Sequence, residues 1–152
     1  MAIQKLQQSR ALAITPTDNG GIYAPWDVLV AAKSYTSATA SSITDNAVDF
    51  SATNVKVGDV VYNPGSGKTS LVTSVSGNVV GVVTTGFSGG TYAIFKPMSA
   101  LLYVGGAGDL AVVTDGGDEV VFTAVAAGSF LPVHIKQVKA TGTDATAILA
   151  LW

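Results

Sequence analysis

Short runs of strand-forming residues, separated by glycine, asparagine or aspartate, recur through most of this 152-residue chain. Strands at spacings of about 8–12 residues with turn residues between them are typical of sandwiches and barrels. The sequence therefore predicts an all-β protein. Only residues 26–35, WDVLVAAKSY, have a faint helical pattern, which the β-branched Val28 and Val30 weaken. The predicted strands are 59–63, 69–75, 79–85, 91–95, 101–104, 110–114, 119–125, 133–140 and 147–152.

The composition narrows the classes of partner. Charged residues make up 12% of the chain, against about 25% in an average protein. The net charge is -2 and the eight Lys and Arg are spread along the sequence, which argues against nucleic acid as a partner. No apolar run approaches the ~18 residues of a membrane-spanning helix, and residues 1–14 predict no secretory signal. Cysteine is absent, so disulfides and thiolate metal sites are excluded.

The stretch NPGSGKTSLV, residues 63–72, resembles the end of a phosphate-binding loop. That motif needs a glycine five positions before Gly67, where this chain has Tyr62, and it needs a helix after Lys68. Strand-like sequence follows instead. We interpret the stretch as a hairpin turn with Lys68 pointing into solvent.

A second glycine-rich stretch, YVGGAGDLA at 103–111, approximates a dinucleotide-binding fingerprint. Here too the helix that should follow is missing, because 110–114 is strand-like. The sequence favours a tight hairpin between the strands at 101–104 and 110–114.

The isolated polar residues of the sequence do not indicate a catalytic or metal-binding site. His134 is the single histidine, so it is either a pH-sensitive contact between subunits or, as we favour, an ordinary surface residue. Asp115, Asp118 and Glu119 do not match a calcium-loop spacing and suit a hairpin turn. A pair of catalytic carboxylates for glycoside hydrolysis is an alternative that the sequence leaves open. Three further aspartates could form it, although nothing in their local sequence marks them as catalytic: Asp49, Asp59 and Asp109. We predict no enzyme, no cofactor, no metal site and no catalytic residue.

Two tryptophans are candidate anchors. Trp26 and Trp152 are either core residues of one subunit or contacts across a subunit boundary, where aromatic residues are enriched. Trp152 follows AILAL and is expected to close the last strand. Short polar arms order mainly on contact, so residues 1–10, with Met1, Lys5 and Arg10, are expected to grip a partner. The candidate interface residues are Met1, Lys5, Arg10, Trp26 and Trp152.

Three ordered sequence blocks near the end of the chain resemble a known family. They are LYVG-x-x-GDL at 102–110, V-x-F-x-x-V-x-x-G-x-x-LP at 120–132 and TGT-x-AT-x-I-x-ALW at 141–152. Together with SRALAITPTDNGGI at 9–22, they resemble the small spike-base proteins of tailed-phage heads and gene transfer agents. In short family members these parts lie close together in sequence. About 75 residues separate them here, and residues such as 45–63 are similar to small β modules of phage structural proteins.

The resemblance implies a virion structural protein located on the outside of a phage head and made in the host cytoplasm. We expect a jelly-roll-like or sandwich base from residues 1–31 and 98–152. A small β-barrel or β-sheet module, residues 32–97, is inserted into it, with 36–46 as a loop or linker that enters the module. The expected function is capsid decoration or a spike base. The partners are then the major capsid protein and further copies of the chain, with a trimer preferred over a pentamer.

The competing function is a carbohydrate-binding or host-contact module of a fibre or tail. Trp26, Tyr35 or Tyr92 would then stack on sugar rings.

Overall fold

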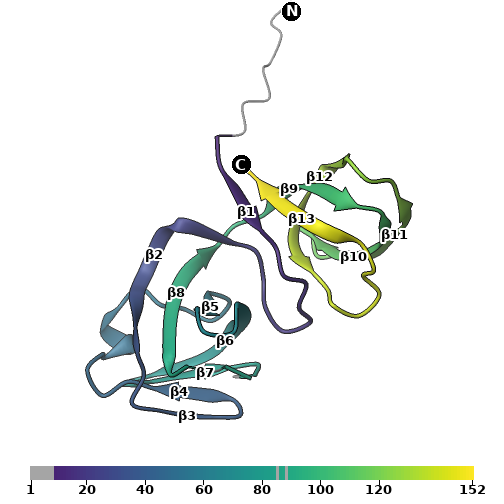
Figure 1. Cartoon of the computed structure of the whole chain (residues 1–152). Coiled ribbons are helices and arrows are strands. Elements are labelled where there is room, and N and C mark those ends of the chain that lie inside the picture. Colours follow the sequence, from purple (N-terminus) through teal and green to yellow (C-terminus); the bar gives the residue numbers. More distant parts are fainter. Residues whose placement is uncertain (1–8, 85, 88) are drawn as a thin grey trace, which may run out of the picture. The chain divides into compact units, whose positions relative to one another are not determined.

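The computed structural model describes residues 9–84, 86–87 and 89–152, which form two compact units (Figure 1). The split unit comprises Ser99–Trp152 and the N-terminal segment that ends at Pro16, and the central unit is Thr17–Met98. All strand pairs are antiparallel, and the single helical element in the described residues is a 3-10 turn, η1 (Phe50–Ala52). The prediction of an all-β protein is confirmed.

The split unit contains one six-stranded sheet in the order β1-β13-β9-β12-β10-β11. Its first strand pairs with its last, with Ala11 opposite Leu151, so both ends of the sequence contribute to this sheet. The strands are β1 (Ala11–Ala13), β9 (Ala100–Gly106), β10 (Gly108–Thr114), β11 (Glu119–Val125), β12 (Ser129–Val138) and β13 (Thr146–Leu151).

Alternating small and branched apolar residues of these strands form the core of the split unit. On β9, residues 100, 102 and 104 point inward, as expected for a strand with one buried face. Pro132 lies within β12, where the register shifts between Leu131 and Ile135. A proline cannot donate to a ladder, and this irregularity accommodates it. The buried side chains include Leu102, Val104, Leu110, Val112, Ile135, Val138 and Ile148.

The central unit contains a seven-stranded sheet in the order β2-β8-β5-β6-β7-β4-β3. Val72 on β6, Tyr92 and Ile94 on β8, and Phe50 on η1 pack in one hydrophobic cluster. The strands are β2 (Tyr23–Ser34), β3 (Ser37–Thr39), β4 (Ser42–Thr44), β5 (Val60–Asn63), β6 (Lys68–Ser76), β7 (Val79–Val82) and β8 (Thr91–Pro97).

The division into units differs from the sequence-based one at the N-terminal side. Residues 17–31, which we assigned to the base, lie in the central unit. The cause is local: β2 pairs with β8 from Tyr23 to Ser34, and the backbone before it packs on β6. Leu71 donates its N–H to the Asn19 carbonyl, and a side chain at Gly20 would collide with Thr69. At the C-terminal end of the central unit, the boundary in the sequence falls between residues 98 and 99, one residue from the predicted boundary.

One local interpretation is wrong, and one weak helical pattern does not form a helix. Residues 26–35, with their faint helical pattern, belong almost entirely to strand β2, because Val28 and Val30 pair with β8. Residues 36–46, interpreted as a loop or linker, contain the β3–β4 hairpin. Ile43 of that hairpin is buried in the core cluster and β4 pairs with β7. Tertiary contacts therefore override the polar local sequence.

Turn chemistry predicts two hairpins correctly and one wrongly. The β5–β6 and β10–β11 pairs are hairpins, as predicted. The glycine-rich stretch at 105–109 is not, because β12 lies between β9 and β10. Gly108 has another role: a Cβ there would lie 2.6 Å from the Ala145 nitrogen. The backbone of Asp144 and Ala145 approaches this closely because both N–H groups donate to the Asp109 carbonyl.

Candidate interaction surface

Two of the five candidate interface residues, Arg10 and Trp152, are neighbours in the structure. The backbones of Arg10 and Trp152 exchange hydrogen bonds of 3.1 and 3.0 Å. The indole N–H of Trp152 donates to the Ser99 carbonyl at 3.0 Å. The contacts of Trp152 are therefore with its own split unit, and its side chain is partly exposed. Met1 and Lys5 lie outside the described residues.

Trp26 belongs to the central unit. It lies on β2, at one edge of the seven-stranded sheet, and 37% of it is exposed. Val28, two residues further along, is also exposed. A large aromatic residue beside an exposed valine on an edge strand is a reasonable contact surface. Of the aromatic residues proposed for sugar stacking, Tyr92 is fully buried, so it cannot present its ring to a ligand.

A further exposed apolar surface lies on β11, which the sequence interpretation did not single out. No residue of β11 is buried, and Val120 and Val121 are 40% and 52% exposed although they point to opposite faces of the strand. On the same unit, Phe130 of β12 is exposed and lies 5.1 Å, centroid to centroid, from Tyr103 of β9. The signal in the sequence was EVVFTAV, whose apolar residues do not alternate with polar ones as a half-buried strand requires.

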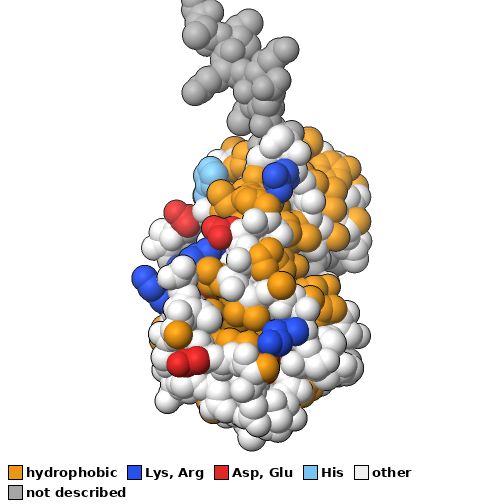
Figure 2. Space-filling model, turned by 90° about the vertical axis from the view of Figure 1, so that its left-hand side faces the viewer, with side chains coloured by type: hydrophobic (Ala, Val, Ile, Leu, Met, Phe, Trp, Pro, Cys, Tyr) orange, Lys and Arg blue, Asp and Glu red, His pale blue; other side chains and the backbone are white. Residues whose placement is uncertain are grey.

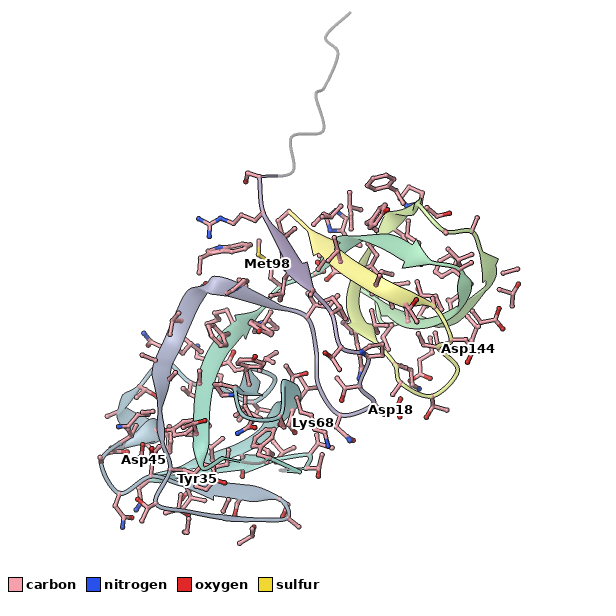
Figure 3. The ribbon with its side chains drawn as sticks, in the orientation of Figure 1. Asp18, Tyr35, Asp45, Lys68, Met98 and Asp144 are labelled. Atoms are coloured by element: carbon pink, nitrogen blue, oxygen red, sulfur yellow. The ribbon has the colours of Figure 1, made fainter. Side chains whose placement is uncertain are left out.

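The most perturbed ionisable groups form a buried network in the central unit. Asp45, labelled in Figure 3, accepts hydrogen bonds from two groups, the Tyr92 hydroxyl at 2.7 Å and the Ala47 N–H at 2.9 Å. Lys33 Nζ lies 3.2 Å from the Asp45 carboxylate. Burial pushes the pKa of Asp45 upward, but these three partners outweigh it and hold the pKa below the usual value. Burial, and then the Asp45 carboxylate, raises the pKa of Tyr92 well above its usual range.

This network is structural. Asp45 and Tyr92 are 2% and 0% exposed, so no substrate reaches them, and no buried side-chain nitrogen or oxygen of the described residues lacks a hydrogen-bond partner. Perturbed pKa values also arise in structural ion-pair networks. The second buried carboxylate behaves similarly: Asp59 accepts from the Lys56 N–H and lies 3.3 Å from Lys96 Nζ.

Three aromatic rings on the same sheet contact one another, with Tyr23 buried and Tyr62 and Phe95 partly exposed. Tyr23 stacks on Phe95 with centroids 4.7 Å apart and lies near Tyr62. Burial, followed by the Tyr62 phenol, raises the pKa of Tyr23 to about 12. The three rings pack against one another across β2, β5 and β8.

The candidate carboxylates for glycoside hydrolysis each have a separate structural contact. Asp49 caps η1 by accepting from the Ser51 N–H, Asp59 binds Lys96, and Asp109 accepts from the Ala124 N–H at 2.8 Å. Asp49 and Asp59 belong to the central unit and Asp109 to the split unit. Over the described part of the chain, no three His, Cys, Asp or Glu residues gather as a metal site.

The remaining motifs form turns or surface. Pro64–Gly67 is the turn of the β5–β6 hairpin, and Lys68 follows it exposed (Figure 3). Asp115–Asp118 forms the β10–β11 turn, in which Gly117 N–H and Thr114 N–H donate to backbone carbonyls. His134 is exposed on β12.

Charged side chains are sparse on the face drawn in Figure 2, where hydrophobic and uncharged polar surface predominates. Within the described ranges, no helix has the length and apolar character to cross a bilayer. No protein family, curated protein sequence or solved structure gives a significant match to the chain.

Proposed function

We propose that this chain is a virion structural protein that decorates the outside of a phage capsid or forms the base of a head spike. The observation that carries the proposal is the location of the family-like blocks. Residues 102–110, 120–132 and 141–152 all belong to the split unit, and the strand in the N-terminal block, β1, pairs with β13 in the same sheet. The three C-terminal blocks and residues 9–16 of the N-terminal block are thus parts of one compact unit, as parts of a family domain interrupted by an insertion would be, whereas residues 17–22 of that block lie in the central unit.

The surface supports the same class of function. A chain with 12% charged residues and an exposed apolar strand is better suited to an assembly than to a solitary existence in solution. Decoration requires no catalytic group. It requires several copies that each contact the major capsid protein weakly, so that the attachment is strong through avidity.

Copy number in purified virus particles tests the proposal. Quantitative mass spectrometry of the particles should find hundreds of copies per capsid for a decoration protein and a few tens for a spike base. Absence from the particles would refute the proposal. Location on a fibre or tail by labelled antibody would replace it with the host-contact alternative.

The N-terminal arm is tested separately. Ser9 and Arg10 donate backbone hydrogen bonds to the Trp152 carbonyl, so a truncation should stop before them. A chain that lacks residues 1–8 should keep its fold and lose binding to empty heads. Normal decoration by this truncated chain would show that the arm is not the capsid contact.

A further inference from the structure

The outer edge of β11 carries unused backbone hydrogen-bonding groups. β11 is the last strand of the six-stranded sheet, and β10 is its one strand partner in the described residues. Thr114 N–H donates to the Asp118 carbonyl, and Val112 lies opposite Val120. Because alternate residues of an antiparallel strand face the partner, residues 118, 120 and 122 face β10. Glu119, Val121 and Thr123 therefore direct their N–H and C=O groups away from the sheet.

The usable edge ends at Thr123. Ala124 has a φ of 51°, in the left-handed region, and its N–H donates to the Asp109 carboxylate. The backbone turns there and the extended ladder stops. At the other end the Asp115–Asp118 turn limits the strand. A partner strand therefore has the five residues 119–123 to pair with.

β11 lacks the protection that the other sheet edges have. β1 and β3 are only three residues long. β2 is long, but it contains Pro25 and two charged residues, and its pairing shifts register three times. Short length, proline, charge and irregularity are the features that prevent edge strands from adding to other chains. β11 contains no proline, and its single register shift lies beyond Phe122, at the end of the usable edge. Its one charge, Glu119, lies 2.9 Å from Lys139 Nζ.

The strand is complementary to itself. If two copies of β11 pair antiparallel with Val121 opposite Val121, then Glu119 of each copy lies opposite Thr123 of the other. No like charges face each other, and the three outward-facing residues of each strand meet as hydrogen-bonded pairs. Among the described edges, only another β11 offers this length without an interruption.

We propose that β11 is the subunit interface: two copies of this chain pair through residues 119–123 about a two-fold axis, so that their six-stranded sheets become continuous. The contact is isologous, with the same residues on both sides. Its affinity comes from main-chain hydrogen bonds, as in other strand additions, and from burial of Val120 and Val121. It gives a dimer as the basic assembly, in place of the trimer that the sequence favoured. The proposal does not depend on attachment to a capsid.

The first test measures the mass in solution. Sedimentation equilibrium of the whole chain should give twice the monomer mass of 15.3 kDa. Val121→Lys places two ammonium groups opposite each other at the axis and should weaken dimerisation by more than about tenfold, because like charges directly opposite are destabilising. The control is Val57→Lys, at a valine 67% exposed in the central unit and outside any strand. This variant should stay dimeric.

A charge swap tests the register. Val121→Lys mixed with Val121→Glu should restore a dimer that neither variant forms alone, since only this register places position 121 opposite itself. Circular dichroism of each variant should match the unchanged chain. A monomeric unchanged chain, an oligomer that Val121→Lys leaves intact, or a mixture that stays monomeric would each overturn the proposal.

Discussion

The two units fill their cores differently. Every buried polar or charged residue in the described chain belongs to the central unit: Asp45, Asp59, Asn63 and Ser70. The buried residues of the split unit are aliphatic throughout, from Ala100 to Ala150. The difference teaches that the central unit depends on particular hydrogen bonds and ion pairs, whereas the split unit depends on apolar burial and on pairing of the two chain ends. The unfolding transitions of the two units should therefore respond differently to truncation of core side chains, to acid and to backbone strain.

The largest effect is expected from core truncation. Leu102→Ala in the split unit and Ile94→Ala in the central unit each remove a fully buried side chain. Each should cost its own unit about 2–5 kcal/mol of unfolding free energy, through lost burial and the cavity left behind. Differential scanning calorimetry should show two transitions, with each variant lowering one of them. Equal lowering of a single transition by both variants would contradict independent units.

The second-largest effect is expected from acid, which should lower the unfolding free energy of the central unit more than that of the split unit. The depressed pKa of Asp45 means that the unfolded chain takes up a proton more readily than the folded one. The carboxylate therefore stabilises the central unit above its unfolded pKa of about 3.8, and this contribution disappears as the pH falls through the folded value. Asp45→Asn should cost about 1–3 kcal/mol at neutral pH, because Lys33 loses its buried partner. It should also flatten the acid dependence of the central transition.

Tyr92→Phe is the matched control for this network. It keeps the ring in the core and removes one hydrogen bond to Asp45, so a loss of about 1 kcal/mol is expected. Because the Lys33 and Ala47 contacts persist, part of the acid dependence should remain. The split-unit transition should not respond to either variant. An equal acid response in both units would show that buried carboxylates do not cause the difference.

The sequence indicates the strands well and their neighbours poorly. Runs such as 119–125 and 91–95 match β11 and β8 closely because β-branched residues and turn residues are local signals. The order of strands is set by contacts between distant residues. Nothing in YVGGAGDLA shows that β12 lies between β9 and β10. Likewise, no local signal links Asp45 to Tyr92, which are 47 positions apart.

The candidate interface illustrates the same limit. The sequence indicates Trp26 and Trp152 because aromatic residues are common anchors, and the structure places Trp152 against Ser99 of the same chain. The exposure of β11 was missed because a continuous apolar run is typical of a strand buried on both faces. Only its position at the end of the sheet shows that both faces and one edge are open.

A smaller loss of unfolding free energy is expected from backbone strain at one glycine in each unit. Gly67 in the central unit and Gly128 in the split unit have φ values of 68° and 81°, and neither would place a Cβ within 4 Å of another group. Alanine at either site should therefore act through backbone strain alone and cost about 1 kcal/mol. Each variant should lower only the transition of its own unit in calorimetry. A loss well above that size would indicate a contact that the structure does not contain.

The smallest effect is expected at Lys68, on which the nucleotide interpretation of NPGSGKTSLV depends. The side chain is exposed beside a hairpin turn, and no helix N-terminus follows to hold a phosphate. Lys68→Ala should therefore change the unfolding free energy by less than about 0.5 kcal/mol, and Mg-ATP should leave the melting temperature of both proteins unchanged. Lys96→Ala is the contrasting variant, because it leaves the buried Asp59 carboxylate without its cation and should destabilise the central unit more. A nucleotide-dependent rise in melting temperature that Lys68→Ala abolishes would show that this turn binds phosphate after all.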